Sequence, residues 1–130
     1  MSVTIDGTSG VTLGSGDLTF PDATTQTTAP LSVGVGQTWQ NVSASRVNGT
    51  TYTNSTGKPI IVSIGNYIAT SSYVNLTVDG IAVGYATGNS TGGAVGSSIT
   101  AVVPNGSTYV FTATVVSGAG ITRQFWSELR

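Results

Sequence analysis

The sequence predicts an all-β protein: an antiparallel, jelly-roll-like β-sandwich preceded by an N-terminal arm of short strands. Apolar and polar residues alternate over 73–78 and 109–115, turn sequences recur at short intervals, and no stretch keeps a 3.6-residue apolar period. The composition agrees, because 18 glycines supply turns while only 7% of the 130 residues are charged. An average domain has roughly 25% charged residues, so hydroxyl and amide side chains must keep this surface soluble.

Residues 1–29 hold three short apolar bursts, at 3–5, 11–13 and 18–20, with Gly-containing turns between them. Strands of this length bury too little apolar surface to be stable alone. We therefore expect an attachment arm or stalk that packs on another subunit or another protein, with a mobile terminal arm as the alternative. The expected attachment or trimer contacts are Val11, Leu13, Leu18 and Phe20.

Residues 30–130 are expected to form the sandwich domain, which begins with a linker punctuated by Pro and Gly. Trp39 is interpreted as a core anchor, because buried aromatic side chains dominate small cores. Val42 and Ala44 alternate with polar neighbours and are expected to face the same core.

The strand-like stretches Thr50–Thr53 and Ile60–Ile64 flank residues 54–57, whose Asn and Gly favour a turn. Pro59 precedes the second stretch, and the start of a strand tolerates a missing N–H. This pattern predicts a central β-hairpin with a half-polar first strand and a mostly buried second strand.

A second hairpin is predicted around Asp79-Gly80, because a two-residue type I′ turn needs positive φ at both central positions. Residues 73–78 alternate cleanly before this turn, and residues 81–85 continue the alternation after it. Residues 65–72 are expected to form a polar loop and residues 86–98 a long flexible loop.

Three more strands are expected at 99–103, Thr108–Val116 and Arg123–Leu129, separated by turns that contain Gly. Together they give seven or eight strands beyond residue 35. That number is enough for a sandwich or a jelly roll.

Five blocks of the sequence resemble bacteriophage tail-fibre and related virion structural proteins. Gly49–Ile60 looks like a hairpin of these proteins, and Val35–Arg46 resembles the segment that precedes it there. Leu18–Ala29 is similar to a common fibre segment, and Trp126–Arg130 resembles the way such chains often finish. The run Val-Pro-Asn-Gly-Ser-Thr-Tyr at 103–109 also resembles these domains.

The ionisable residues do not suggest chemistry, so we expect no enzyme activity, no cofactor and no metal site. The chain has no His or Cys, and its five acids are scattered without a spacing that suggests a catalytic pair. Asp17 and Asp22 lack the acidic-loop pattern of a calcium site. A net charge of −1 gives no basic footprint for nucleic acid, and no apolar run approaches the roughly 18 residues of a membrane span.

The loops Tyr67–Tyr73 and Tyr85–Ser98 are the candidate receptor-facing surface. Exposed Tyr among Ser, Asn and Gly is suited to adaptable recognition, for example of a host surface polysaccharide. Packing of these tyrosines on the sheet is an equally weighted alternative. The residues concerned are Tyr67, Tyr73, Tyr85 and Asn89.

The resemblance implies a structural protein on the exposed surface of a phage virion, without chemistry. It implies a homotrimeric fibre-like domain that contacts other tail or capsid proteins and serves attachment or host adhesion. Two alternatives stay open: a capsid decoration or cement protein or head fibre, and a carbohydrate-binding module, which needs a solvent-facing aromatic platform.

Overall fold

The chain divides into two compact units, Met1–Pro30 and Leu31–Arg130. The computed structural model describes residues 4–6, 10–12, 18–19, 25–26, 32–89, 93–116 and 120–130.

The described residues of the first unit form four short strands in two antiparallel pairs. β1 (Thr4–Asp6) pairs with β2 (Gly10–Thr12), and β3 (Leu18–Thr19) pairs with β4 (Thr25–Gln26). Of the expected contact residues, Val11 and Leu18 lie in β2 and β3, whereas Leu13 and Phe20 lie outside the described residues.

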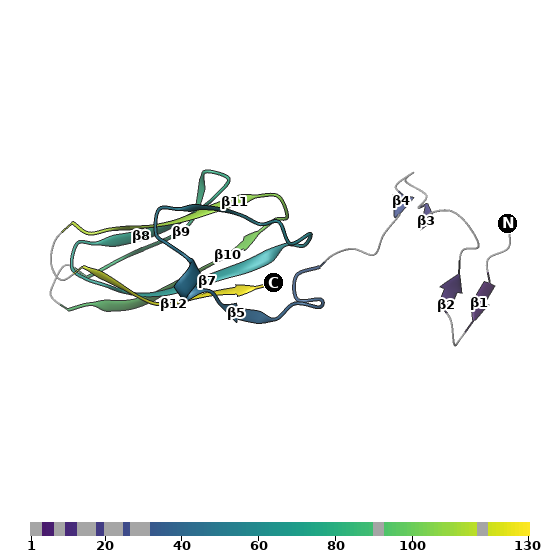
Figure 1. The fold of residues 1–130 in the computed structure, drawn as a ribbon, viewed down its shortest axis with the longest axis horizontal. Coiled ribbons are helices and arrows are strands. Elements are labelled where there is room, and N and C mark those ends of the chain that lie inside the picture. Colours follow the sequence, from purple (N-terminus) through teal and green to yellow (C-terminus); the bar gives the residue numbers. More distant parts are fainter. Residues whose placement is uncertain are drawn as a thin grey trace. The chain divides into compact units, whose positions relative to one another are not determined.

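The second unit is a sandwich of two antiparallel sheets, β10-β7-β12-β5 and β6-β11-β8-β9, which confirms the predicted all-β fold. Figure 1 shows β8 and β11 in one layer and β7 and β12 in the other. Its elements are β5 (Trp39–Asn41), the 3-10 helix η1 (Ser43–Ser45), β6 (Thr51–Thr53), β7 (Ile60–Ile68), β8 (Tyr73–Val78), β9 (Ile81–Thr87), β10 (Val95–Val103), β11 (Thr108–Thr114) and β12 (Ile121–Leu129).

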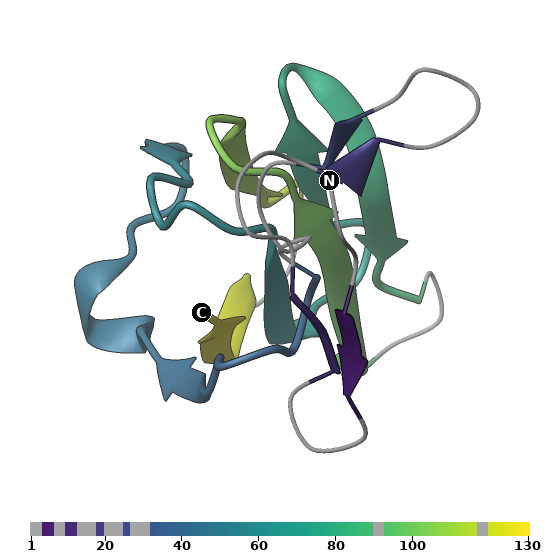
Figure 2. The same ribbon diagram turned by 90° about the vertical axis from the view of Figure 1, so that its right-hand side faces the viewer.

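The strand order is that of a jelly roll. In the described sandwich only β8 and β9 are consecutive strands of the same sheet, and every other connection crosses to the opposite sheet. The segment between β5 and β6, drawn in blue, makes the first crossing along one side of the sandwich (Figures 1 and 2).

The β8–β9 hairpin is confirmed with its predicted turn. Asp79 and Gly80 have φ values of 49° and 79°, as a type I′ turn requires. The register pairs Val78 with Ile81 next to the turn. Asp79 also accepts a 2.7 Å hydrogen bond from the backbone N–H of Thr108, which ties the turn to β11.

The predicted central hairpin is wrong, because its two strands belong to different sheets. β6 pairs with β11, whereas β7 lies between β10 and β12. Asn54 is 2% exposed, and its Nδ2 donates to the carbonyls of Lys58, Val103 and Pro104 at 2.7, 3.0 and 3.1 Å. This buried amide therefore fixes the chain where it crosses between the sheets. The expected burial of the second strand is confirmed, because β7 is a central strand.

Strands extend into both predicted loops, at 65–72 and 86–98. β7 continues to Ile68, β9 continues to Thr87, and β10 begins at Val95. β7 and β10 pair along their whole length, with Gly96 opposite Tyr67 and Ser98 opposite Gly65. The glycines suggest turns in the sequence, but here they make room for aromatic rings on a sheet face.

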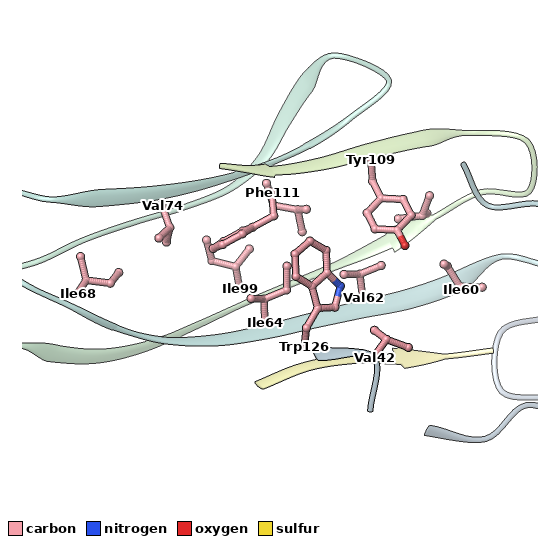
Figure 3. Close-up of a cluster of buried hydrophobic side chains, with 12 residues drawn as sticks. Val42, Ile60, Val62, Ile64, Ile68, Val74, Ile99, Tyr109, Phe111 and Trp126 are labelled. Carbon is pink, nitrogen blue, oxygen red and sulfur yellow. The ribbon is translucent and has the colours of Figure 1, made fainter. Parts of the chain in front are cut away.

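The core anchor is Trp126, and the assignment of Trp39 to the core is wrong. Trp39 is 55% exposed on the edge strand β5, and Ala44 is also exposed, whereas Val42 is buried as expected. Trp126 is fully buried, and its ring packs edge-on against Phe111 at 5.5 Å between centroids (Figure 3). The other buried apolar residues of this cluster are Ile60, Val62, Ile64, Ile68, Val74, Leu76, Ile99, Val103 and Tyr109.

We predict that Gly88→Ala lowers the free energy of unfolding by about 1–3 kcal/mol, because the added Cβ would overlap the fixed backbone carbonyl of Ala69. The matched control is Gly96→Ala, whose Cβ would meet only the ring edge of Tyr67, at 3.3 Å. The control should stay within about 0.5 kcal/mol of the parent. Urea unfolding of the three proteins makes the comparison, and equal losses in both variants would contradict this packing at Gly88.

Candidate functional site

The sandwich divides the expected receptor-facing residues between its two sheets. Tyr73 and Tyr85 come together on β8 and β9, with ring centroids 5.6 Å apart and planes at 31°. Tyr67 belongs to β7 of the opposite sheet, and Asn89 follows the end of β9. Tyr67 therefore lies on a different sheet from Tyr73 and Tyr85, although it is next to residues 96–98 of the second predicted loop.

Tyr67 has an aromatic neighbour that the sequence analysis did not single out. Phe125, on β12, pairs with Gly65, and its ring occupies the space that a side chain at Gly65 would fill. Tyr67 in turn lies over Gly96 of β10, where a Cβ would be 3.3 Å from its Cε1. Because glycine has no side chain, both rings rest against the sheet while remaining 50% and 38% exposed.

The two rings border an open hollow of about 420 Å³ on the outer face of β10, β7 and β12. Its lining combines aromatic carbon with hydroxyl and amide groups, and it contains no charged residue. The lining residues are Gly65, Asn66, Tyr67, Gly96, Ser97, Ser98, Gln124 and Phe125. Flat aromatic surface beside neutral donors and acceptors suits a neutral polar ligand with one apolar side, such as a sugar ring.

The spacing of the rings also bears on ligand size. Tyr67 and Gly65 are two residues apart on one strand, and each ring lies over a neighbouring strand position. The two ring positions are therefore offset by roughly 7 Å along the strand direction. That distance suits successive units of a chain-like ligand better than two faces of one small ring.

The same outer face carries an apolar row at its other end. The register aligns Val102 with Ile61, Ile61 with Leu129, and Leu129 with Trp39, across all four strands of this sheet. Val102 and Trp39 are both more than half exposed. Apolar rows of this kind are typical of surfaces that contact another protein.

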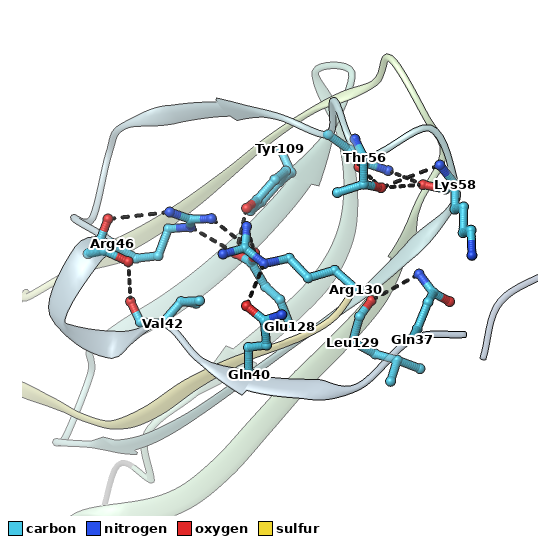
Figure 4. Close-up of polar contacts among 12 residues, drawn as sticks. Gln37, Gln40, Val42, Arg46, Thr56, Lys58, Tyr109, Glu128, Leu129 and Arg130 are labelled. Atoms are coloured by element: carbon cyan, nitrogen blue, oxygen red, sulfur yellow. Dashed lines mark hydrogen bonds and ion pairs between the residues drawn. The ribbon is translucent and has the colours of Figure 1, made fainter. Parts of the chain in front are cut away.

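The one Glu of the chain lies at the centre of a buried polar cluster (Figure 4). Glu128 is fully buried, and Arg46 binds both of its carboxylate oxygens, at 2.8 and 2.9 Å. The Tyr109 hydroxyl donates to Oε1 at 2.6 Å, and Arg130 approaches Oε2 at 3.3 Å. Every partner is held by packing or by strand pairing, so this carboxylate acts as a structural bridge.

Burial and the Glu128 carboxylate both affect the pKa values of the neighbouring Tyr109 and Arg46. Burial raises the pKa of Tyr109, and its hydrogen bond to Glu128 raises that pKa further. Burial works to lower the pKa of Arg46, but the hydrogen bonds and charge of Glu128 outweigh it, so that the pKa of Arg46 is raised. The guanidinium of Arg46 also lies 4.5 Å from the centre of the Tyr52 ring, which adds a cation–π contact.

The sequence analysis missed this cluster, although a signal was present. Trp126 and Glu128 are two residues apart on a strand, so a buried Trp126 places Glu128 in the same core. A buried carboxylate needs cationic and hydrogen-bonding partners, and the sequence does not show which of the cations will meet it.

Asp79 also serves the fold. Asp79 binds the backbone N–H and hydroxyl of Thr108, and the backbone bond is the main cause of its lowered pKa. The described residues bring no three His, Cys, Asp or Glu side chains together as a metal site. Asp17 and Asp22 lie outside the described residues. No helix among the described residues is long and apolar enough to span a membrane.

Comparison with known proteins identifies no relative. No protein-family model matches the chain, and neither a curated protein nor a solved structure matches it.

We predict that the free energy of unfolding falls as the pH rises above about 10, the ordinary pKa of a tyrosine. The unfolded chain then releases the Tyr109 proton, whereas the folded chain retains it because its pKa is raised. The stability that the raised pKa of Tyr109 contributes is fully present below about pH 10 and is lost as the pH rises further. Urea unfolding of the parent and of Tyr109→Phe at pH 8 to 11 measures it. The variant should show a shallower alkaline decline, and identical slopes would contradict the prediction.

Proposed function

We propose that the chain is a structural protein of a phage virion, in which the sandwich is a non-enzymatic adhesion domain and residues 1–29 form the attachment arm. The observation that carries this proposal is the neutral aromatic hollow of Tyr67 and Phe125 on an open sheet face. A host surface polysaccharide is the partner that its chemistry favours, since it offers hydroxyls together with apolar ring faces.

The fold and the sequence supply further support. The strand order of this sandwich is that of a jelly roll, a fold found in viral capsid and lectin domains. The sequence blocks that resemble phage fibres favour the virion. The two acids of the sandwich, Glu128 and Asp79, are engaged in structural bonds, which supports binding without catalysis.

The proposal includes a homotrimer, in which copies of the chain cover one another's apolar row of Val102, Ile61, Leu129 and Trp39. Interface cores are depleted in charge, and this row contains no charged side chain. Cyclic symmetry closes such contacts and prevents open-ended association. The three-fold symmetry itself follows from the resemblance to fibres.

The test uses phage particles that carry the Tyr67→Ala/Phe125→Ala double variant. The matched control is Tyr85→Ala, which removes an exposed tyrosine from the opposite sheet. We predict that mass spectrometry finds the chain in all purified particles, and that only the double variant adsorbs to host cells more slowly, by about tenfold or more.

The two halves of the proposal fail separately in this experiment. Particles that never contain the chain would contradict the virion role. Particles that contain the double variant and adsorb at the parent rate would contradict adhesion through this hollow, and would favour a decoration or cement role.

A further inference from the structure

A second hollow of about 420 Å³ lies where the segment between β5 and β6 passes the end of β12. Two of its lining residues are arginines, in a chain that has only four Lys and Arg residues in total. The lining residues are Arg46, Val47, Asn48, Ile121 and Arg123. This hollow differs in chemistry from the neutral hollow of Tyr67 and Phe125, because it is cationic.

Arg123 is fixed in place by neutral acceptors. Its Nη2 donates to the carbonyl of Ser43 at 2.8 Å, and its Nη1 donates to Oδ1 of Asn48 at 3.3 Å. Its guanidinium also lies 5.4 Å from the centre of the Trp126 ring. No described carboxylate lies within ion-pair distance of it, since both ion pairs of the described residues involve Glu128. The positive charge of Arg123 is therefore held rigidly and is not compensated.

Arg46 adds to the positive potential of the hollow. Its Nε and Nη2 engage Glu128, whereas its Nη1 makes only a 3.4 Å contact with the Ser45 carbonyl. Glu128 is shared between Arg46 and Arg130, so its single negative charge is divided between two guanidinium groups. Residues 31–130 contain four cations and two acids, a net charge of +2, although the whole chain has a net charge of −1.

We propose that this hollow binds an oxyanion, a carboxylate or phosphate group, with Arg123 as its principal ligand. Guanidinium groups bind both anions in a planar, two-pronged geometry, and preorganised donors lose little entropy on binding. Asn48 provides a neutral polar contact beside the anion, and Val47 and Ile121 complete the lining with apolar atoms. The inference does not depend on the proposed adhesion role, because it rests on different residues.

The test is an NMR titration of the full-length chain at low ionic strength with inorganic phosphate, with D-glucuronate and with D-glucose. We expect saturable shifts of the backbone amide signals of Asn48 and Ile121 with one or both anions, and none with glucose. The anion that binds more tightly identifies the class of ligand. Added sodium chloride should weaken binding, because the site is partly exposed to solvent.

Two variants distinguish specific anion binding in this hollow from non-specific attraction by the positive charge of the domain. Arg123→Gln should weaken anion binding by about tenfold or more. Arg130→Gln removes the same charge close to the cluster but outside the hollow, and should change affinity by less than about threefold. Thermal unfolding of each variant verifies that the domain remains folded. Absence of saturable shifts in the parent would overturn the proposal, as would equal affinity losses in the two variants.

Arg123→Lys keeps the proposal testable if the Gln variant does not fold. Lysine retains the charge but not the planar fork, so affinity should fall while remaining measurable. Arg123 could instead serve only to hold the segment between β5 and β6 in place. In that case the Lys variant would be less stable but would bind the anion as the parent does. That outcome would also overturn the proposal.

Discussion

The carboxylate of Glu128 is buried in the sandwich and is bound by Arg46, Tyr109 and Arg130. These contacts join β12 to the segment between β5 and β6 and to β11 of the opposite sheet. The segment that makes the first crossing of the jelly roll therefore packs on a buried charge, the carboxylate of Glu128. Removal of Arg46 would leave this carboxylate with less compensation of its charge. The packing of Tyr52, Tyr109 and Trp126 beside this cluster depends on the same crossing.

Much of the fold follows from local sequence, but the pairing of strands does not. Asp79-Gly80 determines its hairpin by backbone conformation, so that element was predictable. The crossing at Asn54 depends on hydrogen bonds to residues about 50 positions away, which no local pattern reveals. Gly65 and Gly96 suggested loops because their packing partners, Phe125 and Tyr67, lie on other strands. Of the two rings at the candidate site, only Tyr67 was predicted. Phe125 was not, because it packs over Gly65, which is far away in the sequence.

The polar and aromatic groups of the sandwich divide into three regions with different roles. The inner cluster of Glu128 joins strands of the two sheets, the hollow of Tyr67 and Phe125 is lined by neutral residues, and the hollow of Arg123 is lined by two arginines. Two of the three arginines of the chain pair with its one glutamate, and the neutral hollow on the outer face of β10, β7 and β12 is lined by uncharged residues. Such faces suit contacts with neutral polymers and with further copies of the chain.

A double-mutant cycle between Arg46 and Glu128 tests the central structural claim most directly. The free energies of unfolding of the parent, Arg46→Met, Glu128→Gln and the double variant give the coupling between the two side chains. The account predicts a favourable coupling of about 1.5–3 kcal/mol, as for hydrogen bonds to buried charged groups, with the double variant nearly as stable as either single variant. A coupling near zero would contradict the role of Glu128 as the bridge between the sheets.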